Sequence, residues 1–291
     1  MKFFKYILLS ILIMNLISCK TLSDTATDFT PEHVFTKGIE GPATNSKGEL
    51  YVVNFEKEGT IGKVDKKGNG SVFAVLPGKS VGNGIRFDRK DNMYIADYVN
   101  HNVLTITNGT NQAVVFAHES RANQPNDVAI SPDGTLYASD PNWKDSTGNL
   151  WKVDRNGFHL LESNMGTTNG IEVSPDGKKL YVNESVQKRI WVYTIGQQGN
   201  VSGKKLFYSF KDFGLDGMRC DSKGNLYVCR YGAGKVVVLS PRGKKIREIR
   251  LKGKNPTNIT FGGKNKKQCF VTISDRGAIE TFFAKYPGKD F

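Results

Sequence analysis

Cysteines and acidic residues are both scarce in this sequence. Only 4 of its 291 residues are cysteine, which excludes a small scaffold held together by disulfides. Asp and Glu number 28 against 41 Lys and Arg, so the formal net charge is +13. With 38% hydrophobic and 24% charged residues, collagen and an intrinsically disordered chain are excluded. The length allows one large domain or two small ones, each with a real core.

The apolar segment near the N-terminus is short. Lys2 and Lys5 provide a basic start, and the nearly continuous apolar run 6–16 follows. This pattern is typical of a secretory signal peptide and is too short for a membrane-spanning helix. The segment ends with Leu16-Ile17-Ser18-Cys19. That ending resembles the lipobox of bacterial lipoproteins, in which the signal is removed before a cysteine that is then acylated.

The lipobox resemblance implies an exported, lipid-anchored protein. We expect residues 1–18 to be a lipoprotein signal peptide, Cys19 to be the lipidation site and residues 19–31 to be a flexible tether. An ordinary cleaved signal with a chance cysteine is the alternative. Lys20 directly after the cysteine favours the outer membrane. A protein of the cell envelope meets no genomic DNA, so we expect its positive charge to face anionic envelope surfaces and not nucleic acid.

Six copies of one pattern fill the chain after this segment. Their first residues lie 41 to 47 residues apart, and no helical periodicity accompanies them. A period near forty without helices predicts a β-propeller and not a helical solenoid. The six copies begin at Glu40, Asn83, Asn126, Asn169, Asp216 and Thr257.

Each copy contains a short apolar strand, a turn and a second strand. In a turn such as Ser131-Pro132-Asp133-Gly134, Pro presets φ, Asp bonds back to the backbone and Gly takes the left-handed position. Alternating stretches such as 103–106 supply the third and fourth strands. The sequence therefore predicts an all-β fold, a six-bladed β-propeller with four-stranded blades, over residues 32–291. We expect residues 32–36 to supply the outer strand that closes the ring with the last blade.

The first residues of the copies predict a ring of polar side chains. The innermost strand of each propeller blade lines the central channel, so equivalent positions meet at one depth. All six ring residues carry a side-chain oxygen, and Glu40 and Asp216 are carboxylates. Ca²⁺ takes about six to eight oxygen ligands, whereas Zn²⁺ prefers His or Cys, which the ring lacks. We therefore expect one divalent metal ion, Ca²⁺; the alternative is that these side chains only hydrogen-bond the channel mouth.

Four of these positions carry a family resemblance. Glu40-Gly41-Pro42, Asn126-Asp127, Asn169-Gly170 and Asp216-Gly217-Met218 resemble the signature motifs of the regucalcin/gluconolactonase family, which are six-bladed calcium-dependent lactonases. The resemblance covers the chain from about Gly38 onward. It implies a single catalytic metal held by Glu40, Asn126, Asn169 and Asp216.

The resemblance also implies the chemistry. A bound cation would polarise the carbonyl of a lactone or related ester and stabilise the oxyanion that forms. Asp216 would act as general base on water or as nucleophile, and we favour base-assisted hydrolysis. Arg219 stands where diisopropyl fluorophosphatase, which has a similar metal constellation, has an aspartate for a second buried calcium. A second metal is therefore not expected in that form, and the protein is expected to be a monomer.

Further residues are candidates for substrate binding. Gln124 stands where many sugar lactonases of this family have an arginine. A neutral amide cannot pair with a carboxylate such as the one that forms when an aldonolactone ring opens, which disfavours an aldonolactone substrate. The loops between second and third strands lie on the metal face and contain His101, Glu184 and Arg230, and Asn83 belongs to the ring. We expect these five side chains to contact substrate; a solvated His101 and an ion-paired Arg230 are the structural alternatives.

A non-catalytic propeller is the second functional hypothesis. The stretch from Asn83 to His101 resembles the NHL-type repeat of interaction propellers. Such a protein would bind a ligand or a protein partner in the cell envelope. Glu40 and Asp216 favour the enzyme, because a binding propeller does not need two carboxylates among channel amides.

Overall fold

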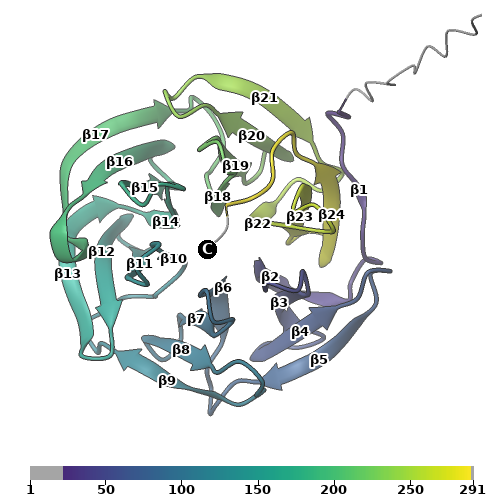
Figure 1. The fold of residues 1–291 in the computed structure, drawn as a ribbon, viewed down its shortest axis with the longest axis horizontal. Helices are drawn as coiled ribbons and strands as arrows, with labels where there is room; N and C mark the ends of the chain where they lie inside the picture. The colour runs from purple at the N-terminus through teal and green to yellow at the C-terminus, as the bar shows by residue number, and fades with distance from the viewer. Residues whose placement is uncertain (1–21, 290–291) are drawn as a thin grey trace, which may run out of the picture.

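The structure, a computed structural model, describes residues 22–289, which form six four-stranded antiparallel sheets around a central axis (Figure 1). The sheets follow one another as blades in chain order, so the predicted six-bladed β-propeller is confirmed. Between residues 22 and 289 the only helical element is the short 3₁₀ turn η1 (Gln197–Gly199). No helix in this range has the length and apolarity of a membrane span.

Within each blade, the first strand lines the channel and the following strands lie successively closer to the rim. Blade one contains β2 (Phe35–Thr44), β3 (Leu50–Phe55), β4 (Thr60–Val64) and β5 (Gly70–Val75). Blade two contains β6 (Gly82–Phe87), β7 (Met93–Asp97), β8 (Asn102–Ile106) and β9 (Ala113–His118). Blade three contains β10 (Val128–Ile130), β11 (Leu136–Asn142), β12 (Thr147–Asp154) and β13 (Gly157–Gly166).

The second half of the ring repeats this order. Blade four contains β14 (Thr168–Val173), β15 (Lys179–Glu184), β16 (Arg189–Ile195) and β17 (Val201–Ser209). Blade five contains β18 (Met218–Cys220), β19 (Leu226–Arg230), β20 (Lys235–Leu239) and β21 (Lys245–Arg250). Blade six contains β22 (Pro256–Gly262), β23 (Gln268–Ile273), β24 (Ala278–Phe283) and, from the other end of the chain, β1 (Thr27–Asp28).

The ring closes through β1, and this corrects two predictions. Thr27 pairs with Thr281 and Asp28 with Glu280, so the outer strand of blade six is β1 and not residues 32–36. Residues 35 and 36 instead begin β2, the innermost strand of blade one. Residues 22–31 are also not a free tether, since Ala26 is 1% exposed and its N–H donates to the carbonyl of Arg250 at 2.9 Å. The predicted signal peptide and Cys19 lie outside the described residues.

Apolar side chains pack between neighbouring blades. Strand alternation turns every second residue towards the next sheet. Between blades one and two, for example, Tyr51 and Ile61 pack with Ile85 and Ile95 in one buried cluster. Equivalent clusters follow around the ring. These interfaces fix the blades relative to one another and thereby hold the channel residues in place.

The regular pairing of each innermost strand with its neighbour is interrupted, or has not yet begun, at the predicted ring residue. Register shifts occur in β2, β6, β14 and β22, and β10 and β18 begin two residues after Asn126 and Asp216. Such irregularities re-aim side chains away from the sheet. The freed backbone groups bond to the next blade: the Gly84 N–H donates to the Asn126 carbonyl at 2.8 Å.

Candidate metal centre

Two acids face each other in the channel. Glu40 is 6% exposed, and Asp216 is half-buried in the segment leading into β18. Burial raises the pKa of the Glu40 carboxyl to about 8, and the nearby carboxylate of Asp127 contributes to the rise. Burial, followed by repulsion from Glu40, raises the pKa of Asp216 well above its usual value. Glu40 is therefore close enough to Asp216 to oppose its ionisation, as expected of ligands that lack a cation.

Amide oxygens without partners lie in the same part of the channel. The Oδ1 atoms of Asn126, Asn169 and Asn183 are buried and accept no hydrogen bond from any described residue. The Asn169 side chain hydrogen-bonds the Asp216 carboxylate, which opposes the rise in its pKa. The Nδ2 of Asn183 donates to the Asp216 carbonyl at 2.6 Å. Unpaired buried oxygens are costly, so these three suit a ligand that the protein chain does not supply.

The donor set fits a hard divalent cation. Carboxylate and amide oxygens are the ligands that Ca²⁺ prefers. Residues 22–289 contain no group of three or more His, Cys, Asp or Glu arranged as a metal site. A zinc-type centre is thus not formed by these residues, while two acids and unpaired amides suit calcium. Asn183, the next-to-last residue of β15, was not among the predicted ligands, although its side chain contacts the backbone of Asp216.

A second polar layer lies one residue further along the innermost strands. Asp127 and Asn258 fill the channel here, and the Nδ2 of Asn258 lies 3.4 Å from Oδ2 of Asp127. Both fit only because their neighbours are glycines. A Cβ on Gly84 would lie 2.2 Å from Oδ1 of Asp127, and one on Gly217 would lie 2.0 Å from Cγ of Asn258. This layer was not among the predicted features, although the position after the ring residue is glycine in the other four copies and only Asp127 and Asn258 depart from it.

Two arginines, Arg86 and Arg219, lie beside the carboxylate of Asp127. The Nη1 of Arg86 donates to Oδ1 of Asp127 at 3.1 Å, and the Nη1 of Arg219 lies 4.0 Å from Oδ2. Arg86 and Arg219 are 7% and 6% exposed. A guanidinium therefore occupies the channel at Arg219, where the sequence comparison pointed to the loss of a second metal ligand.

Glu184 and Arg230, both predicted to contact substrate, are paired within their own blades. Glu184 is 1% exposed; its Oε1 accepts the N–H of Gly166 at 2.9 Å and its Oε2 binds Nε of Arg189 at 2.5 Å. Arg230 is 5% exposed, and its Nη2 donates to the carbonyl of Asp212 at 2.5 Å and to its Oδ1 at 2.9 Å. Neither side chain has its charge available for a substrate.

Glu184 and Arg230 each bind a segment that precedes the channel residue of their own blade, and we call this contact a clamp. The same clamp recurs in other blades. Asn54 and Asp140 occupy the repeat positions equivalent to Glu184 and Arg230, at or near the C-terminal end of the second strand of their blades. The Nδ2 of Asn54 donates to the Gly38 carbonyl at 2.6 Å, and Oδ1 of Asp140 accepts the Gln124 N–H at 2.6 Å. Each clamp therefore holds the segment that leads into the channel residue of its own blade.

The remaining predicted substrate residues differ in how the scaffold engages them. The Nδ2 of Asn83 donates to the Asn126 carbonyl at 3.0 Å, which ties blade two to blade three. The backbone of Gln124 is held by Asp140, and its side chain is half-buried. His101 has a positive φ of 58° and a buried Nδ1 without a partner among the described residues. The scaffold bonds the Asn83 side chain once and Gln124 only through its backbone, and it leaves Nδ1 of His101 without a partner among the described residues.

Comparisons with known proteins show the family to which the chain belongs. Residues 39–275 match the protein family described as the SMP-30/Gluconolactonase/LRE-like region. The gluconolactonase of Zymomonas mobilis is 28% identical over 218 residues, which cover 66% of this chain and 60% of that protein. Regucalcin of Danio rerio is 29% identical over 185 residues, covering 60% and 62% of the two chains. The chain spans about three fifths of the length of the curated relatives that it matches.

A solved structure supports the fold. The calcium-binding protein regucalcin of Agrobacterium tumefaciens superposes with a TM-score of 0.76 at 21% identity, covering 93% of this chain and 96% of that chain. At this level of identity the likeness bears on the architecture alone. It agrees with the six blades described above.

Proposed function

Because the chain belongs to the SMP-30/gluconolactonase/LRE-like family, we propose that it is a calcium-dependent hydrolase of a lactone or related ester. Its metal ligands are Glu40, Asn126, Asn169 and Asp216. The observation that carries this proposal is the pair of buried, unpaired Oδ1 atoms of Asn126 and Asn169 in the channel that holds two acids. Packing alone gives no reason to bury unpaired acceptors beside carboxylates whose ionisation is already unfavourable.

The chemistry requires a cation and a base. These four residues would hold the divalent cation, which when bound would supply the positive charge that polarises the substrate carbonyl and stabilises the oxyanion. Asp216, in its ionised form, accepts a proton from the attacking water, and the hydrogen bond from Asn169 favours that form. The Nδ2 of Asn258, 3.0 Å from Oε2 of Glu40, fixes the orientation of the second acid. We prefer this role for Asp216 to direct nucleophilic attack.

The substrate class follows from the relatives and from the polar groups at the channel mouth. Curated relatives are named gluconolactonase, 6-deoxy-6-sulfogluconolactonase and pentonolactonase. In this chain the candidate contacts Asn83, His101 and Gln124 are amides and one imidazole, and Arg230 is engaged by Asp212. We therefore propose an uncharged lactone, whose hydroxyls or ring oxygen these groups hydrogen-bond.

Metal content and turnover test the proposal together. Purified protein is analysed for bound metal and assayed on a panel of neutral lactones before and after chelation, with calcium added back. We expect about one divalent ion per chain and loss of turnover on its removal. Protein that neither retains nor binds a divalent ion at millimolar calcium would contradict the metal hydrolase and favour the non-catalytic propeller.

A matched pair of variants isolates Asp216. Asp216→Asn keeps the side-chain volume and is expected to lower kcat by roughly 100-fold or more, the usual contribution of a general base. Asp65→Asn alters an exposed acid in the turn between β4 and β5, at the other end of the strands from the metal face, and should leave kcat unchanged. Undiminished turnover of folded Asp216→Asn would remove Asp216 from the mechanism.

The envelope location is proposed separately. Cys19 is the proposed lipidation site, with the protein held at the outer membrane as a monomer. Radiolabelled palmitate should be incorporated into the full chain and not into Cys19→Ser, and the variant should lose its membrane fraction. Equal labelling of both forms would contradict the anchor. Light scattering of the detergent-solubilised protein tests the monomer.

A further inference from the structure

Two exposed aromatic side chains lie next to each other on the metal face of the propeller. Phe213 precedes blade five and is 51% exposed, and Tyr231 follows β19 and is 38% exposed. A Cβ built on Gly232 would lie 3.1 Å from Cδ1 of Phe213, and one built on Gly214 would lie 3.6 Å from Cβ of Tyr231. Each aromatic residue therefore rests against the neighbour of the other, and we call the two the aromatic pair.

The aromatic pair belongs to the same two segments as the proposed base. The N–H of Gly214 donates to the Tyr231 carbonyl, and the N–H of Asp216 donates to the Cys229 carbonyl, both at 3.0 Å. Exposure falls within three residues from Phe213 to the half-buried Asp216. Burial raises the pKa of Tyr231, and the nearby carboxylate of Asp216 adds to the rise. The pair thus stands at the solvent end of the segment that carries Asp216 into the channel.

Phe213 has a backbone conformation that is unfavourable for its side chain. Its φ is 47°, in the left-handed region, where glycine is the ordinary residue and a bulky side chain is an outlier. Burial does not compensate for this, because half of the residue stays exposed to water. Strained residues of this kind cluster at active sites and ligand clamps. Contact with a ligand gives a reason for an aromatic side chain at this position, and packing does not.

Other apolar side chains extend the surface around the mouth of the channel. Val99, Trp143 and Val186 are exposed in the loops that follow β7, β11 and β15, as Tyr231 is in the loop after β19. The corresponding loops of blades one and six carry charged residues at 56–58 and 275–276. The mouth is therefore apolar on one side and charged on the other, and the apolar side includes the edge next to Asp216.

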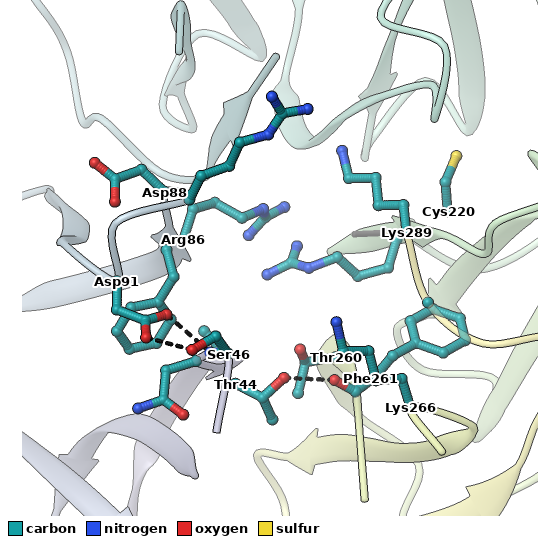
Figure 2. A pocket seen from close by; sticks show the side chains of 16 residues that line it. Thr44, Ser46, Arg86, Asp88, Asp91, Cys220, Thr260, Phe261, Lys266 and Lys289 are labelled. Atoms are coloured by element: carbon teal, nitrogen blue, oxygen red, sulfur yellow. Dashed lines mark hydrogen bonds between the residues drawn. The ribbon is translucent and has the colours of Figure 1, made fainter. Parts of the chain in front are cut away.

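The opposite end of the channel has a different character. A cavity of about 260 Å³ lies there, among the turns that follow the innermost strands, such as those of Ser46 and Asp91. Its lining is mostly polar or charged, and Figure 2 shows Arg86 and Lys289 extending into it from different walls. Neither member of the aromatic pair lines this cavity. An apolar group attached to a lactone at the metal centre is therefore expected at the mouth on the metal face.

We propose that the aromatic pair is a specificity subsite, and that the lactone hydrolysed at this centre carries an apolar substituent that packs against the rings of Phe213 and Tyr231. The inference rests on the proposed hydrolase and names its class of substrate more closely. The lactone ring lies at the metal centre, and the substituent extends towards the mouth. Contact with the two rings removes apolar surface of the substituent from water, which favours binding.

Two lactones that share one ring test the substituent. γ-Butyrolactone is the neutral lactone without a substituent, and γ-nonalactone carries an alkyl chain of five carbons on the same ring. Each methylene removed from water strengthens binding by up to about fourfold, so kcat/KM for γ-nonalactone should be higher by at least about tenfold. Equal kcat/KM values would overturn the inference and leave the hydrolase intact. Turnover of no lactone in the panel would overturn both.

Variants of the aromatic pair locate the effect. Tyr231→Ala and Phe213→Asn each remove one ring and should lower the ratio of the two kcat/KM values by about fivefold. Tyr231→Phe keeps the ring and should restore most of the ratio. Ile246→Ser changes an exposed apolar residue on β21, the outer strand of blade five, and should not change the ratio.

A surface that docks a protein or a membrane would give another result. The ratio would then be the same in wild type, Tyr231→Ala and Phe213→Asn, and this outcome would overturn the inference. Asn adopts a positive φ more readily than Phe, so Phe213→Asn keeps the test valid if Tyr231→Ala does not fold. Thermal unfolding of each variant shows that the change in ratio does not come from loss of the fold.

Discussion

The Nδ2 atom of Asn258 lies 3.0 Å from Oε2 of Glu40 and 3.4 Å from Oδ2 of Asp127. One amide in blade six therefore bridges two buried carboxylates from blades one and three. Such a contact across the channel exists only when the ring is closed. Closure by β1 and the geometry of the metal centre are in this way linked through a single side chain.

Replacing Asn258 tests that link. Asn258→Leu keeps the approximate volume and removes the two bonds of Nδ2 together with those that Oδ1 accepts from Ile259 and Arg219, so the free energy of unfolding should fall by about 1–3 kcal/mol. Because the bond to Asn258 lowers the pKa of Glu40, that pKa should rise further and metal binding at neutral pH should weaken. Urea denaturation and calcium titration provide the two measurements. Asn69→Leu removes an exposed bond to Asp65 in a turn and should leave the calcium titration unchanged.

The pKa of Glu40 predicts a pH dependence for the metal-free protein. Its value of about 8 lies above the ordinary value of 4.5, so between these values the folded state holds a proton that the unfolded state has released. Stability should therefore fall as pH rises through this window. Glu40→Gln cannot ionise and should lose less stability between about pH 5 and pH 8.

Glu49 provides a control of opposite sign. Its hydrogen bond to Lys63 lowers its pKa to about 2, so its contribution is present above its unfolded pKa and is lost only on acidification. Glu49→Gln should therefore leave the decline from pH 5 to pH 8 as in wild type. Chemical denaturation of chelated protein at several pH values measures both variants, and identical curves for Glu40→Gln and wild type would contradict the prediction.

Asp127 should be among the most sensitive positions for stability. Asp127→Asn removes the carboxylate that Arg86 and Arg219 share, and breaking a buried pair costs about 3–5 kcal/mol. Asp154→Asn breaks the exposed pair with His159 and should cost less than about 1 kcal/mol. Denaturant unfolding of the two variants side by side measures the difference; equal losses would mean that Asp127 does not hold the arginines.

Arg230 is expected to stabilise a loop and not to select a substrate. Its guanidinium bonds to Asp212 and stacks 3.7 Å from the ring centroid of Phe210. Arg230→Met should increase proteolytic cleavage within residues 211–214 and lower thermal stability, with KM for a neutral lactone unchanged. Limited proteolysis and steady-state kinetics separate the outcomes. A raised KM with normal proteolysis would restore the substrate role.

The repeat made most of the fold predictable. Copies 41 to 47 residues apart, with Pro, Asp and Gly in their turns, specify local strands and hairpins, and hairpin order determines the blades. The closing strand was not predictable in the same way. β1 has two residues, both exposed, so no apolar alternation marks it, and only β24 gives it a partner.

The candidate site was predictable at the first position of the repeat, but not at the position that follows it. Equivalent positions in a closed ring share one depth, so aligning the copies identified Glu40, Asn126, Asn169 and Asp216 as channel residues without any coordinates. Asp127 and Asn258 are the two exceptions to glycine at the next repeat position, but no prediction was drawn from them. Their contact with each other and with Glu40 depends on distances across the channel, which no single copy contains.

The sequence by itself thus determined the blades, the turns and the depth of each channel residue, because these follow from local hydrogen bonding and a constant period. The tertiary structure decided which polar groups meet. It engaged Glu184 and Arg230 in clamps within their own blades, left the amide oxygens of Asn126 and Asn169 unpaired, and set Arg86 and Arg219 against one shared acid. Those outcomes depend on contacts between and within folded blades, where burial makes the pairing of each polar group decisive.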